Sequence, residues 1–209
     1  MSDATRTLLR CGIIAAPLYL LVGYAQALTR DGFDFRRHAL SQLAQGDMGW
    51  IQTVNFIVTG LLVIAGSVGV RRVLKGQRAG TWGPILLTVF GLGMLGAAAF
   101  RADAGNGFPP GTPEAAEMTQ TGIMHFVFGA VTFYALILAC FVFARRFLGQ
   151  GRTGMAVVSI LTGLGFLASF SAIVMGTSSA MVMPAFYLAV TWSMLWHSVL
   201  VRDVAQSTA

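Results

Sequence analysis

Residues 122–144 read GIMHFVFGAVTFYALILACFVFA, an apolar run of 23 residues without a lysine, arginine, aspartate or glutamate. A helix needs about 20 such residues to cross the hydrocarbon core of a bilayer. Because the run lacks the alternation of a membrane β-strand, its backbone groups must pair with one another in a helix. Five more runs of this kind occur, at residues 11–28, 51–70, 82–100, 154–175 and 182–201. The sequence therefore predicts an all-α integral membrane bundle of six transmembrane helices.

The overall composition agrees with a membrane environment. Of the 209 residues, 56% are hydrophobic and only 11% are charged, and the mean hydropathy is +0.71. Six crossings leave only short connections, so we expect residues 1–209 to form a single polytopic membrane domain. The net charge of +6 does not indicate nucleic acid as a partner, since the basic residues flank apolar runs and do not gather on one water-exposed surface.

The distribution of charge predicts the orientation. Ten of the 14 basic residues lie in the tails and in the second and fourth connections, and four lie in the other loops. By the positive-inside rule, both termini are expected in the cytoplasm of a cell (inner) membrane protein. The ten are Arg6, Arg10, Arg71, Arg72, Lys75, Arg78, Arg145, Arg146, Arg152 and Arg202, and the four are Arg30, Arg36, Arg37 and Arg101.

The first apolar run also imitates a signal peptide, because Ala25-Gln26-Ala27 looks like a small-residue cleavage site. The run is about as long as a short crossing, and Tyr19, Tyr24 and Gln26 are unusual in a signal core. We expect the first run to be retained as a helix, with cleavage as the alternative.

Short motifs for cofactors are not convincing. Gly91, Gly93 and Gly96 spell G-x-G-x-x-G, but that fingerprint works only between a strand and a helix. Inside an apolar run such small residues favour close helix packing. Cys11 and Cys140 lie in or beside apolar runs, and the histidines and outer carboxylates lack diagnostic ligand spacing. We predict no metal site and no cofactor.

Polar residues gather in the first outer loop, around Asp34, Arg36, Arg37 and His38. They are interspersed with phenylalanines and leucines, which is unlike a plain solvated linker. One interpretation is an aromatic anchor with its charges among lipid headgroups. The other is a polar lid that points back over the mouth of the bundle.

A second polar group is expected at the same face. Arg101, Asp103 and Phe108 lie in a loop of about 20 residues, a length that indicates function or disorder. His125 lies one turn inside the fourth run, and Gln52 and Asn55 begin the second. An ionisable residue at membrane depth suggests function, although a neutral imidazole bonded to a backbone carbonyl is the alternative. Together with apolar walls, these groups could line an outward-facing pocket.

Several stretches resemble a known family. They are FDFRRHALSQL (33–43), GDMGWIQ (46–52), NFIVTG (55–60), ADAGNGFPPGTP (102–113), GIMH (122–125) and CFVFARRF (140–147). Together they resemble the bacterial membrane family catalogued as domain of unknown function 998. The resemblance implies a six-helix membrane domain and no established activity.

Three functions remain open for this outward-facing pocket. The first is a membrane-embedded acid/base enzyme, of cyclase or isomerase type, acting on a lipidic or prenylated substrate. The second is a non-catalytic lipid-binding or accessory protein, and the third is a small transporter. The expected partners are membrane lipids and a hydrophobic small molecule. The enzyme hypothesis assigns proton transfer to Asp34, Asp103 and His125, and substrate binding to Arg36, Arg37, His38, Gln52, Asn55, Arg101 and Phe108.

Overall fold

The computed structural model describes residues 1–115 and 117–207 of the chain. Over these residues the chain forms six α-helices and one short 3-10 helix, η1. In chain order they are α1 (Asp3–Thr29), η1 (Leu40–Ala44), α2 (Gly49–Val73), α3 (Trp82–Ala99), α4 (Gln120–Leu148), α5 (Thr153–Val174) and α6 (Val182–Gln206).

All six α-helices are long and apolar enough to cross a membrane. The shortest, α3, has 18 residues, and a rise of about 1.5 Å per residue gives it a length of about 27 Å. Their outer surfaces are apolar, as shown by Leu21, Leu28 and Leu188, which are each about 70% exposed. In water such surfaces would be unfavourable, whereas hydrocarbon suits them. The chain is a multi-pass membrane protein, and the prediction of six spans is confirmed.

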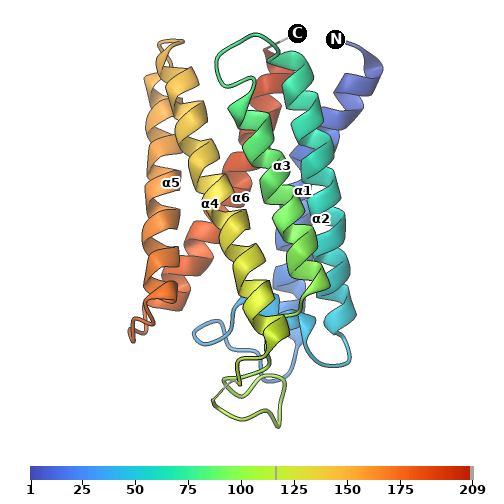
Figure 1. Ribbon diagram of the computed structural model, residues 1–209, viewed down its shortest axis with the longest axis vertical. Helices are drawn as coiled ribbons and strands as arrows, with labels where there is room; N and C mark the ends of the chain where they lie inside the picture. Colours follow the sequence, from blue (N-terminus) through green and yellow to red (C-terminus); the bar gives the residue numbers. More distant parts are fainter. Residues whose placement is uncertain (116, 208–209) are drawn as a thin grey trace.

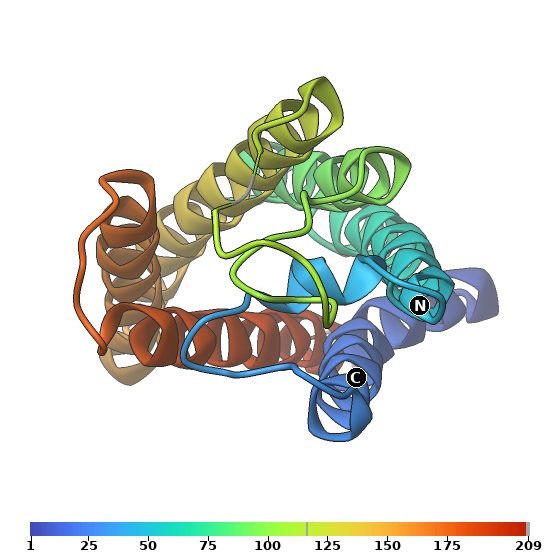
Figure 2. The same cartoon turned by 90° about the horizontal axis from the view of Figure 1, so that it is seen from below.

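The helices run up and down in sequence order (Figure 1) and close into a ring, which is seen end-on in Figure 2. Each helix packs against the one before it, and α6 returns to contact α1 and, more weakly, α2. Both termini lie at one end of the bundle, here named the terminal end. The opposite end carries the long connections at residues 30–48 and 100–119 and is named the loop end. That the terminal end is cytoplasmic stays a prediction of the positive-inside rule.

Glycines bring neighbouring helices into backbone contact. A Cβ added to Gly66 of α2 would lie 2.5 Å from the Cα of Gly12 in α1. A Cβ added to Gly60 of α2 would lie 2.8 Å from the carbonyl oxygen of Gly91 in α3. Real side-chain atoms do not approach backbone so closely, so only glycine permits these crossings. The expected role of small residues in helix packing is confirmed here.

Packing differs along α4. Its residues 120–131, at the loop end, include no buried residue, whereas ten of the 17 residues from Thr132 to Leu148 are buried. α6 shows the same trend, because its first buried residue is Tyr187. The portions of α4 and α6 that lie toward the loop end are therefore packed more loosely than the rest of these two helices.

Candidate functional site

The two long connections at the loop end fold together over the ring (Figure 2). We name residues 30–48 and 101–115 the cap. Its interior is apolar, because Leu43 and Phe108 are fully buried and Leu40 is 6% exposed. A folded interior of this kind is not expected of loops that only connect spans.

His38 lies at the centre of the cap and is only 2% exposed. The backbone N–H of Asp34 donates to its Nδ1 at 2.8 Å, and its Nε2 lies 2.8 Å from the carbonyl oxygen of Asn106. A carbonyl can only accept, so Nε2 carries the hydrogen and the ring is the neutral tautomer. The imidazole therefore joins the first connection to the second.

Phe108 is the apolar centre of the same contact. Its ring lies 5.2 Å from the ring of Phe33 and 5.4 Å from that of His38. The guanidinium carbon of Arg30 lies 5.3 Å from the Phe108 ring centre. Arg30 also donates to the carbonyl oxygen of Gln45 at 2.7 Å. Phe108 thus lies within the folded cap, enclosed by aromatic rings and one cation.

Further bonds hold the two connections to each other and to the bundle. Gln45 donates to the carbonyl oxygen of Ala102, and Arg37 forms an ion pair with Glu114. The Tyr187 hydroxyl of α6 donates to the carbonyl oxygen of His38 at 2.7 Å. The cap is therefore fixed to α6 as well as to the helices that it connects.

The three residues predicted to transfer protons have separate local partners. Exposed Asp34 accepts from the backbone N–H of Arg36 at 2.8 Å. Asp103 accepts from the backbone N–H of Thr119 at 2.9 Å and from its hydroxyl at 2.5 Å, at the start of α4. No hydrogen bond joins any two of the three within the part of the chain that the structure describes. Their convergence on one substrate stays a prediction.

His125 of α4 is half-buried, and its ring is oriented by α3. Its Nδ1 lies 2.7 Å from the carbonyl oxygen of Phe100 and 3.1 Å from that of Ala97. Nδ1 must therefore carry the hydrogen, which is the backbone-bonded arrangement weighed above as the alternative to a functional role. Its Nε2 has no hydrogen-bond partner among residues 1–115 and 117–207.

Gln52 and Asn55 face α1 in a buried polar cluster. Gln26 donates to the Gln52 Oε1 at 2.9 Å, and Asn55 donates to the carbonyl oxygen of Tyr19 at 3.1 Å. Gln26 Oε1 and Gln52 Nε2 are buried without a partner in the described chain. Gln26 was not among the predicted site residues, although a glutamine within an apolar run was the signal that could have indicated it.

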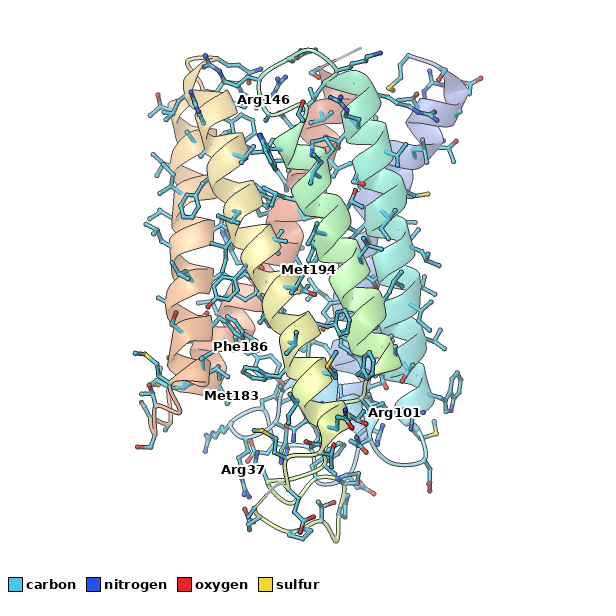
Figure 3. The ribbon with its side chains drawn as sticks, in the orientation of Figure 1. Arg37, Arg101, Arg146, Met183, Phe186 and Met194 are labelled. Atoms are coloured by element: carbon cyan, nitrogen blue, oxygen red, sulfur yellow. The ribbon has the colours of Figure 1, made fainter. Side chains whose placement is uncertain are left out.

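The remaining predicted binding residues point outward. The side chains of Arg36 and Arg101 are exposed, and neither has a hydrogen-bond or ion-pair partner among the described residues. Figure 3 places Arg101 and Arg37 at the loop end, on the side of the cap. Of the predicted set, the structure brings His38, Phe108 and Arg37 into the cap contacts, while Gln52 and Asn55 meet in the α1–α2 cluster.

The fold and the site together define a class: a six-span membrane protein whose two long connections form a folded cap at one end. Residues 13–203 match the family described as protein of unknown function DUF998, and the chain belongs to this family. The family predicted from the sequence is confirmed. Neither the curated proteins nor the solved structures include a match to this chain.

Proposed function

We propose that this protein holds a lipid or another hydrophobic molecule without transforming it, in the half of the bundle next to the cap. The observation that carries this proposal is the space beside Gly129 of α4. Gly129 lies one turn from both His125 and Phe133, on the helix face that these two residues share. A Cβ added to Gly129 would meet no other atom within 4 Å.

A cluster of phenylalanine side chains supports an apolar lining on the side of the ligand space away from the cap. The Phe133 ring of α4 lies 4.9 Å from Phe166 and 5.0 Å from Phe170 of α5, and 5.7 Å from Phe186 of α6. Figure 3 shows Phe186 and Met183 between α5 and α4 near the loop end. Apolar and aromatic walls with few polar groups are typical of ligand pockets.

Contacts between the cap and α6 support the proposal that the cap covers the ligand space at the loop end and is held in place. Phe35 of the cap lies 5.3 Å from Tyr187 of α6, and Tyr187 is bonded to the backbone of His38. Because these contacts hold the cap in place, they favour lateral entry of the ligand from the bilayer, past the loosely packed residues 120–131 of α4. An apolar ligand would then pass from the hydrocarbon of the bilayer into an apolar site in the protein, with little cost of desolvation.

The separate bonding of Asp34, Asp103 and His125 favours binding over catalysis. General acid/base catalysis requires the proton donor and acceptor within hydrogen-bond reach of one substrate. Asp34 is exposed and Asp103 is engaged at the start of α4. We call the face of α4 that carries Gly129 its open face. No contact among the described residues directs either carboxylate at it.

The test is to measure the lipid that remains with the purified protein. The full chain is extracted in a mild detergent, delipidated in steps, and examined by native mass spectrometry. We expect a tightly held hydrophobic molecule on the wild type and on Gly165→Phe, and its loss from Gly129→Phe. Gly165 of α5 is the matched control, because it is exposed and its added Cβ also meets no atom within 4 Å.

Two results would contradict the proposal. One is a wild-type protein that releases all of its lipid as easily as an unrelated six-span protein. The other is a Gly129→Phe variant that folds and retains the same bound molecule as Gly165→Phe.

His125 supports a second candidate, the acid/base enzyme. Its Nδ1–H is held by carbonyl oxygens of α3, which leaves the Nε2 lone pair on a half-buried ring beside the same open face. A neutral imidazole oriented in this way has the protonation state of a general base. Lipid extracts from cells that express the wild type or His125→Gln distinguish the two functions. An enzyme changes the chemical composition of the extract through His125, and a binding protein does not.

A further inference from the structure

We propose that the groove between α1 and α6 at the terminal end binds the phosphate of an anionic phospholipid. The groove is about 330 Å³ in volume. Its charged lining comes from Arg6 and Arg10 of α1 and Arg202 of α6, and its apolar lining includes Leu9 and Ile13. The site lies at the opposite end of the bundle from the proposed ligand space, and the proposal is independent of that function.

Within the described part of the chain, two of the three arginines have no acidic partner. Arg6 pairs with Asp3 at 3.1 Å, whereas Arg10 and Arg202 have no ion-pair or hydrogen-bond partner among the residues that the structure describes. Asp203, the neighbour of Arg202 in sequence, is bonded to Arg152, whose Nη1 donates to it at 2.9 Å. This hydrogen bond raises the pKa of the Arg152 guanidinium above its usual range. Asp203 is thus engaged outside the groove, and Asp3 is engaged with Arg6.

The groove matches a phospholipid in both charge and polarity. Arg10 and Arg202 lie about two turns from the start of α1 and one turn from the end of α6, where a membrane span meets the headgroup region. Half-buried Ile13, about one turn beyond Arg10 along α1, continues the lining toward the hydrocarbon, while Leu9, which is 1% exposed, lies beside Arg10 in the chain. Basic pockets between transmembrane helices recognise anionic headgroups in this way, with the apolar wall receiving the start of an acyl chain.

The experiment compares two variants that remove the same charge from the same end. Arg10→Gln with Arg202→Gln removes the two unpaired arginines of the groove. Arg72→Gln with Lys75→Gln removes two exposed basic residues at the end of α2 and in the loop that follows it, outside the groove. Each full-length protein is titrated in detergent with phosphatidylglycerol or phosphatidylcholine, and bound lipid is counted by native mass spectrometry.

We expect phosphatidylglycerol to bind the wild type and the α2 variant equally and in preference to phosphatidylcholine. At about 1 kcal/mol for each basic residue near a charged surface, the groove variant should bind it roughly thirtyfold more weakly. An equal loss in both double variants would overturn the proposal, since it would indicate a general effect of charge. Equal binding of phosphatidylcholine would also overturn it. Displacement of phosphatidylglycerol by excess inorganic phosphate would overturn the lipid as the ligand and assign the groove to free phosphate.

Discussion

Replacing Gly66 by alanine should separate α1 from α2. The added Cβ would lie 2.5 Å from the Cα of Gly12, whereas ordinary contact begins at 3.4 Å, so the two backbones must part by about 0.9 Å. Both atoms in the clash are held by helix backbone, so no side-chain rotation can relieve it. Overpacking of this kind costs about 1–3 kcal/mol, and the better helix propensity of alanine returns about 0.5–1 kcal/mol. The difference between these ranges is about 0–2.5 kcal/mol, and because rigid backbone stands on both sides of the clash we expect the upper part of it, a net loss of about 1–2 kcal/mol.

The assay is thermal unfolding of the purified protein in one detergent, followed by intrinsic tryptophan fluorescence. For a chain of this length the loss corresponds to a Tm lowered by roughly 2–8 °C. Gly165→Ala in α5 is the matched control, because its Cβ meets no atom within 4 Å, and its Tm should be unchanged or slightly higher. A Gly66→Ala protein as stable as this control would refute the inferred backbone contact of α1 and α2.

Three further substitutions test the cap and the terminal end. His38→Phe keeps an aromatic ring but removes the bonds to two part-buried backbone partners, at about 0.5–1.5 kcal/mol each. Limited proteolysis should then cut the cap, and an uncut cap would contradict the central role of His38. Gly122→Ala would place a Cβ 1.8 Å from an Asp103 oxygen and should lower the Tm by displacing that carboxylate; Asp103→Asn in the same background should then cost little more. Arg146→Met removes two hydrogen bonds to the connection between α2 and α3. It should make that connection cleavable by protease while the cap stays resistant.

The number of spans could be predicted because hydrophobicity is a property of consecutive residues. The run at residues 122–144 is apolar whatever it packs against, and its helix is required by the lack of water in a bilayer. The close approach of Gly60 and Gly66 to their neighbours was likewise indicated by composition alone. What composition does not give is the partner of each glycine, which depends on how the six helices are rotated about their axes.

The contacts of the cap could not be predicted, because they join residues far apart in the chain. Nothing local indicates that His38 bonds to Asn106, or that Tyr187 of α6 bonds to the backbone of His38. Asp103 and His125 lie at the same face, as expected, yet each is bonded to backbone groups near it. A sequence shows which residue types meet at one depth, but the direction of each side chain is set by three-dimensional packing.

The closure of the six helices into a ring also affects how the protein is made. Contacts between consecutive helices link α1 through α6 in order, and the packing of α6 on α1, α2 and the cap joins the last segment to the first ones. During synthesis each new segment can therefore dock on the one inserted just before it. Closure waits for the final segment to leave the ribosome. A chain that stops after α5 should retain the earlier pairings while leaving one side of α1 open to lipid, a form that cellular quality control can recognise.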